Sequence, residues 1–183
     1  MNSDESKKII NWQYGLCPLT SDPGLFGPFE SLVSLWQSKC TPTSLPHRKD
    51  FDFPDFRGWW GKIAIVKFEK DPFNVRFVLW GTQLTEWWGV DYTNKLLGEE
   101  SLSPAIWETV EGRYFKNMVK NPFIGLVQGQ LDQHDRPHKK VVGVDLPLMD
   151  GNEVTQVILA HLELEEGMTF DDLFPIDPST RYF

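Results

Sequence analysis

The sequence has few cysteines, fewer basic than acidic residues and no long apolar run. Only Cys17 and Cys40 occur among its 183 residues, with no CxxC pair and no Cys or His partner nearby at metal-binding spacing. Two free thiols are typical of a reducing cytoplasm, and a single disulfide between the two cysteines is the alternative. The 18 basic residues are outnumbered by 26 acidic ones, which gives a net charge of −8. This charge argues against binding nucleic acid through the overall field of the protein.

Signals for membranes and secretion are also missing. No stretch approaches the roughly 20 consecutive apolar residues that a membrane-spanning helix needs. The first residues contain no basic segment followed by an apolar run, which a signal peptide would have. We therefore expect a cytoplasmic protein with no membrane partner.

Aromatic residues, by contrast, are abundant. They make up 14% of the chain and include eight tryptophans, so large side chains must fill a core, a cavity or an interface. A chain of this length suits one domain. We assign it to residues 28–166, between a loosely docked N-terminal arm of residues 1–27 and a C-terminal tail of residues 167–183.

Hydrophobic periodicity predicts helices and strands in a definite order. A helix is expected from about Pro28 to Cys40, because apolar residues recur there at helical spacing. A broken helical segment covers residues 82–98, and a longer helix capped by Ser103 runs to Asn121. Alternating or β-branched runs predict five strands, at residues 62–70, 73–80, 123–133, 139–149 and 153–164. Short turns such as Asp150-Gly151 join neighbouring strands as hairpins, which indicates an antiparallel sheet and an α+β fold.

Both faces of this sheet are expected to be covered. In the last strand, Ile158 and Ala160 point to one side, whereas Leu159 and His161 point to the other, and both sets are largely apolar. The helical block between the second and third strands can cover one face. The N-terminal helix, a partner chain or both would cover the second face.

Several short motifs, in their order and spacing, resemble those of one protein family. They are Leu35-Trp36-Gln37-Ser38 near the end of the first helix, the segment from Leu45 to Asp52, Gly81-Thr82 after the second strand, Gly89-Val90-Asp91-Tyr92-Thr93, and Leu146-Pro147-Leu148 followed by Asp150-Gly151. From Phe29 to Leu164 the chain is similar to the compact bacterial group of Per-Arnt-Sim (PAS) domains. Asn94 departs from the pattern, since the family often has glycine there, but asparagine tolerates the left-handed conformation.

The resemblance implies a five-stranded antiparallel sheet with helices inserted between its second and third strands. It further implies a sensory or regulatory module without catalytic activity, which binds a small ligand, a signalling protein partner or both, as a homodimer. An interaction module with a solid core is an alternative. A small enzyme with a pocket on a similar fold is another, for which Asp91 and His161 are the candidate titratable residues.

A ligand cavity between the sheet and the helices would be lined by aromatic residues of the helical block and its neighbours. The candidates are Trp80, Trp87, Trp88, Tyr114 and Met118. Adjacent helical residues point about 100° apart, so one of Trp87 and Trp88 should face the sheet and the other the edge of the pocket or the surface. Arg76, placed on the face of Trp80 by strict alternation, would contact an anionic ligand or form an ion pair with Glu163 or Asp145.

Cofactor and interface predictions complete the sequence reading. Covalent flavin is not expected, because no cysteine lies between Gly81 and Met118, and haem is not expected, because the helix from Ser103 to Asn121 contains no histidine. For other cofactors the sequence makes no prediction. The stretch HDRPH, with His134 and His138, is interpreted as a solvated hairpin loop rather than a metal site. The residues assigned to an interface with a second chain are Trp36, Leu159 and His161.

Overall fold

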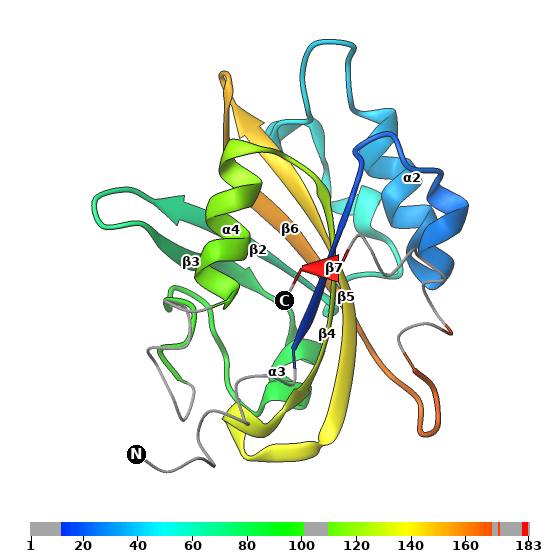
Figure 1. Cartoon of the computed structure of the whole chain (residues 1–183), viewed down its shortest axis with the longest axis vertical. Coiled ribbons are helices and arrows are strands. Elements are labelled where there is room, and N and C mark those ends of the chain that lie inside the picture. The colour runs from blue at the N-terminus through cyan, green and yellow to red at the C-terminus, as the bar shows by residue number, and fades with distance from the viewer. Residues whose placement is uncertain (1–11, 101–109, 170–171, 173–180, 183) are drawn as a thin grey trace.

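The fold is built on one antiparallel sheet. The computed structural model describes residues 12–100, 110–169, 172 and 181–182. In these residues, seven strands form a single sheet in the order β3-β2-β6-β5-β4-β1-β7 (Figure 1). The strands are β1 (Gln13–Cys17), β2 (Ile63–Glu69), β3 (Asn74–Trp80), β4 (Ile124–Leu131), β5 (Arg136–Asp150), β6 (Glu153–Glu163) and β7 (Arg181–Tyr182).

Each of the five predicted strands is present, as β2 to β6, and every pairing in the sheet is antiparallel. The α+β prediction is therefore confirmed at this level. The hairpins β2–β3 and β5–β6 form as expected, the latter through Asp150 and Gly151, whose positive φ of 61° suits a glycine. The sheet is nevertheless wider than the predicted five strands, because β1 and β7 extend it beyond β4.

Part of the predicted N-terminal arm is in fact a sheet strand. β1 pairs along its whole length with β4, from Gln13 opposite Gln128 to Cys17 opposite Ile124. Its alternation explains this position: Tyr14 packs into the core on one face and Cys17 into the core on the other. The strand was not predicted, because it is short and a proline- and glycine-rich segment follows it directly. Of the C-terminal tail, Arg181–Tyr182 pair with β1, and most of the rest lies outside the described residues.

A bulge in β3 changes which side chains point inward. The register between β2 and β3 shifts after Phe77, so that Val66 pairs with Phe77 and Ile65 with Leu79. Val78 is the extra residue. As a result Val78 and Leu79 are exposed, and Trp80 returns to the buried face of Phe77. Strict alternation had placed Trp80 on the face of Arg76, and that prediction is wrong.

Helical segments cover both faces of the sheet, as expected. On one face lies α2 (Glu30–Ser38), preceded by a 3₁₀ turn at Pro23–Phe29; it packs over Ile158 and Ala160. On the other face lie α3 (Thr82–Trp88) and α4 (Val110–Lys120), over Leu159. Figure 1 shows α2 and α4 on opposite sides of the strands. The predicted start of the second long helix, at Ser103, is outside the described residues.

Trp36 lies on the face of α2 that packs against the sheet, rather than in an interface with another chain. Its side chain is fully buried, and its Nε1 donates a hydrogen bond to the carbonyl of Pro147 on β5 at 3.0 Å. The prediction of Trp36 as an interface residue is wrong, because the N-terminal helix already buries this ring against the sheet. No helix among the residues the structure describes has the length and apolar character to cross a membrane.

Candidate ligand-binding site

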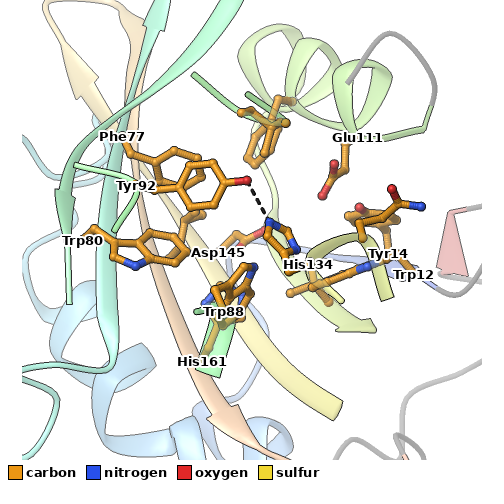
Figure 2. A pocket seen from close by; sticks show the side chains of 16 residues that line it. Trp12, Tyr14, Phe77, Trp80, Trp88, Tyr92, Glu111, His134, Asp145 and His161 are labelled. Carbon is orange, nitrogen blue, oxygen red and sulfur yellow. Dashed lines mark hydrogen bonds between the residues drawn. The ribbon is translucent and has the colours of Figure 1, made fainter. Parts of the chain in front are cut away.

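A cavity lies between the sheet and the segments that cover its second face. The space open to the centre of a water molecule is about 80 Å³, several times the roughly 10–15 Å³ that one ordered water requires. Side chains from β1, β3, β4, β5 and β6 form its floor, and α3, α4 and the segments around Tyr92 and His134 complete its walls. Figure 2 shows these side chains converging.

One wall of the cavity is aromatic. The ring of Trp80 meets Phe77 and Trp88 edge to face, with centroids 5.0 and 5.3 Å apart, and Tyr92 lies 5.1 Å from Trp80. Such tilted and edge-to-face arrangements are the preferred geometries of aromatic pairs. The wall is therefore a packed unit rather than four independent side chains.

Local structure explains how the chain builds this wall. The bulge at Val78 directs Trp80 inward, and α3 ends at Trp88 because Gly89 adopts a left-handed conformation with φ of 75°. The turn that carries Tyr92 is held by Asp91, whose carboxylate accepts a hydrogen bond from the Thr93 amide at 2.8 Å. Asp91 itself is exposed, so it stabilises the turn and does not line the cavity.

Glycines on the sheet make room for two polar side chains, one that lines the cavity and one behind its lining. A Cβ on Gly143 would lie 2.7 Å from Cδ2 of His161, and one on Gly125 would overlap the hydroxyl of Tyr114. Real Cβ atoms do not approach other atoms so closely. The two glycines therefore allow His161 and Tyr114 to lie flat against the central strands.

Asp145 is the most deeply buried acid of the cavity. Only 2% of its surface is exposed, and its Oδ2 accepts a hydrogen bond from the Tyr114 hydroxyl at 2.7 Å. Burial raises the pKa of Asp145 to about 7; the Tyr114 hydrogen bond opposes this shift, and the nearby Glu111 carboxylate adds to it. Burial also raises the pKa of Glu111. Asp145 is thus close to the midpoint of its ionisation at neutral pH.

Two histidines contact the cavity in their neutral form. Burial lowers the pKa of His161 to about 4, and its ring lies edge to face with Trp88 at 5.3 Å. Burial likewise lowers the pKa of His134 to about 4, against an opposing effect of Glu100. A hydrogen bond of 2.8 Å joins Nε2 of His134 to the hydroxyl of Tyr92 (Figure 2).

Unsatisfied polar groups are concentrated in this cavity. Five buried side-chain atoms have no hydrogen-bond partner among the described residues, and each belongs to a residue that lines the cavity. Buried polar atoms in proteins are nearly always hydrogen-bonded, and an unpaired one costs on the order of 1–3 kcal/mol. A polar ligand or ordered waters in the cavity would satisfy these atoms. They are Trp80 Nε1, Gln133 Oε1, His134 Nδ1, Asp145 Oδ1 and His161 Nδ1. The hydroxyl of Tyr14 interacts with the Glu111 carboxyl instead.

The cavity candidates from the sequence fall into two groups. Trp80 and Trp88 line the cavity. Trp87 is also buried, so both adjacent tryptophans are inside, but it packs into the core away from the cavity. Tyr114 and Met118 are fully buried behind the lining residues, where Tyr114 donates a hydrogen bond to Asp145 and packs against Tyr14.

Arg76 does not reach the cavity. Its guanidinium pairs with Glu69 on the neighbouring strand, and its Nη1 donates to the Asn94 carbonyl at 2.6 Å. About a third of its side chain is exposed. The bulge separates Arg76 from Trp80, so the prediction of a ligand contact is wrong. The ion pair anticipated as its alternative exists, but with Glu69 rather than Glu163 or Asp145.

The remaining interface candidates, Leu159 and His161, line the cavity instead. Their strand face was predicted correctly, but the helical block covers that face, whereas α2 covers the opposite one. His161 was expected to be half-buried against the N-terminal helix or a second chain. It is 94% buried and packs against Trp88 of α3.

Sequence reasoning missed Tyr92, Glu111, His134 and Asp145 as cavity residues. For Asp145 a signal existed, because a single carboxyl interrupts the otherwise apolar run VVGVDLPL of a strand buried on both faces. His134 was expected in a solvated loop; it turns inward to Tyr92, while His138 is exposed. The two histidines of HDRPH therefore do not converge.

Cofactor ligands can be assessed only among the described residues. No group of three or more His, Cys, Asp or Glu side chains there has the geometry to hold a metal ion. Cys17 and Cys40 are free thiols associated with the layer under α2, away from the cavity. Histidines do enter the cavity, but from β6 and from the turn before β5 rather than from the long helix.

Comparison with known proteins adds no family to this description. No protein-family model matches the chain, and searches of curated proteins and of solved structures found no similar protein.

Proposed function

We propose that this chain is a sensory or regulatory module of the PAS type that binds a small molecule in the cavity. The observation that carries the proposal is the clustering of unpartnered buried polar atoms around one cavity. A chain selected only for packing would fill this space or remove its polar groups, because each unpaired atom destabilises the fold. The motifs that resemble PAS domains and the insertion of α3 and α4 between β3 and β4 support the same assignment.

Ligand binding can be tested by thermal unfolding of the full chain with a metabolite library, followed by calorimetry of the compounds that raise the melting temperature. Leu97→Phe should abolish these shifts, because Leu97 lines the cavity and a larger ring would fill it. Leu25→Phe is the matched control, since Leu25 is 47% exposed and lies outside the cavity. If no compound binds and Leu97→Phe stabilises the chain, the cavity is a packing defect and the interaction-module alternative is favoured.

The homodimer is part of this proposal. With Trp36, Leu159 and His161 buried, a dimer would use other surfaces, and the exposed hydrophobic side chains offer one. Phe53 and Trp60 stack with centroids 4.7 Å apart and remain 71% and 44% exposed. Light scattering should show a dimer that Phe53→Ser converts to monomer. A monomeric wild-type chain would remove this part of the proposal and leave ligand binding unaffected.

A small enzyme is the second candidate, because His161 and Asp145 share one cavity. A carboxyl with a pKa near the working pH is suited to act as a general base, and burial brings Asp145 to about 7. The two candidates differ in what happens to a bound compound. After long incubation, mass spectrometry should recover the compound unchanged from a sensory module and converted from an enzyme.

A further inference from the structure

The charges around the cavity limit what it can hold. Glu111 and Asp145 are its two acidic side chains, and no lysine or arginine of the described residues lines it. His134 and His161 contribute no positive charge at neutral pH, because burial keeps both rings unprotonated. An anionic ligand would meet two carboxyl groups and no compensating cation, which is costly in a buried site.

We propose, on the basis of the proposed ligand-binding function, that the cavity binds a small organic cation, with its ammonium group between the aromatic wall and the Asp145 carboxylate. Three features of the structure carry this inference. They are the aromatic wall, the unpartnered oxygen of Asp145, and the neutral ring nitrogens beside them.

The aromatic wall places the rings of Trp80, Trp88 and Tyr92 along one cavity. The centroid of the Trp80 ring lies 5.3 Å from that of Trp88 and 5.1 Å from that of Tyr92. A cation within about 6 Å of such rings is attracted by their electron-rich faces, most strongly by tryptophan, and desolvation strengthens the attraction. Figure 2 shows Asp145 beside these rings, with Glu111 farther along the cavity.

Asp145 supplies the charge that would anchor the cation. Its Oδ2 is taken by the Tyr114 hydroxyl, whereas Oδ1 has no partner among the described residues. An isolated buried carboxylate is unfavourable, so burial favours the protonated form. A cation next to the carboxyl group lowers its pKa and favours the ionised form. Binding of the cation should therefore release the proton that Asp145 holds in the empty cavity. The titratable groups facing Asp145 and the cavity from other elements are Tyr14 on β1, Tyr92 after α3, Glu111 and Tyr114 on α4, His134 before β5, and His161 on β6.

The neutral histidines complete the site. Nδ1 of His134 and Nδ1 of His161 are buried without partners, and Trp80 Nε1 is an unpartnered donor. A ligand with a hydroxyl or carbonyl group a few bonds from its ammonium could satisfy one or two of these atoms. Since both rings are uncharged at neutral pH, they would not repel the cation.

Matched probes can separate a requirement for charge from a requirement for shape. Choline has the neutral isostere 3,3-dimethylbutan-1-ol and the anionic analogue 3,3-dimethylbutyrate; n-butylammonium has the neutral counterpart butan-1-ol. We expect calorimetry on the full chain to give affinities at least about tenfold higher for the cations than for their neutral partners, and no binding of the anion. Affinity for the cations should rise by about tenfold from about pH 6 to about pH 8, as Asp145 loses its proton.

Asp145→Asn removes the anchoring charge without changing the shape of the side chain. It should lower the affinity for both cations by about tenfold or more at about pH 8 and abolish the pH dependence. Asp150→Asn, which removes an exposed carboxyl from the same strand, should leave both unchanged. If Asp145→Asn fails to fold, the wild-type chain still tests the inference, through the comparison of charged with neutral probes and through the pH dependence of cation affinity.

Several results would overturn the inference. These are equal or tighter binding of the neutral probes, undiminished binding to Asp145→Asn, affinity for cations that falls as the pH rises, or no binding of either cation at millimolar concentration. The proposed function has a separate outcome. If library compounds that are neutral or anionic bind and Leu97→Phe excludes them, the ligand-binding module stands and only the cation specificity is lost.

Discussion

Replacing Asp145 by asparagine should remove a pH-dependent loss of stability that the buried carboxyl imposes on the folded chain. Burial raises the pKa of Asp145 from its ordinary value of 3.8 to about 7. In this range the folded state holds a proton that the unfolded state has released. The free energy of unfolding therefore falls as the pH rises from about 4 to about 7, and the loss is complete above about pH 7.

The size of this loss follows from the shift. Each tenfold change in an ionisation constant corresponds to about 1.4 kcal/mol, so a rise from 3.8 to about 7 amounts to about 4 kcal/mol. Between about pH 5 and about pH 8, a range convenient for experiment, the loss is about 2–3 kcal/mol. Asparagine carries no charge at any of these pH values and can still accept the hydrogen bond from Tyr114 through its carbonyl oxygen.

Urea unfolding of the wild-type chain and of Asp145→Asn across this pH range provides the measurement. The histidines must be considered, because the lowered pKa values of His134 and His161 make stability rise between about pH 4 and about pH 6.5. Both chains keep these histidines, so the difference between the two unfolding free energies isolates Asp145. We expect this difference to move in favour of the variant by about 2–3 kcal/mol from about pH 5 to about pH 8.

The control is Asp150→Asn, which removes a solvent-exposed carboxyl from the same strand. The reasoning is refuted if the difference between wild type and Asp145→Asn changes by less than about 1 kcal/mol across the range. Asp145 would then be hydrated or paired with a cationic group in the folded state.

Three further substitutions test the fold and the site. Gly81→Ala should prevent normal folding or lower stability by several kcal/mol, measured by urea unfolding, because its Cβ would lie 2.3 Å from the Gly61 carbonyl oxygen, a backbone atom that cannot move aside. Trp36→Phe should cost about 2–4 kcal/mol, since it removes buried volume and leaves the Pro147 carbonyl without its donor. Arg76→Ala should leave both stability and ligand affinity nearly unchanged, because it breaks only a partly exposed ion pair. Loss of ligand binding in this variant would show that Arg76 contributes to the site.

Much of the fold could be predicted because its signals are local. The run of Ile and Val in β2 and the turn at Asp150-Gly151 each indicate their structure within a few residues. β1 was missed because five residues beside a proline-rich segment give too short a pattern. The face of Trp80 was missed because a bulge depends on how two strands pair, which alternation within one strand does not reveal.

The candidate site was predicted less well, because its residues come from segments that are far apart in the sequence. Trp80 and Trp88 were identified from aromatic bulk near the start of the helical block. His134 and Asp145 come together with them only through the pairing of β4, β5 and β6 and the inward turn of the loop before β5. Their ionisation depends on burial, which is a property of the packed molecule rather than of the residue type.

The sequence by itself determined the five central strands, the helical block between β3 and β4, and the two sides of β6, with Ile158 on one side and Leu159 on the other. These features follow from periodicities of two and 3.6 residues that the chain carries locally. The tertiary structure alone decided that Leu159 and His161 face a cavity rather than a partner chain, that Trp80 points inward, and that Asp145 is buried with a free oxygen. Each of these depends on contacts between segments distant in the sequence, and such contacts leave no periodic pattern in any one of them.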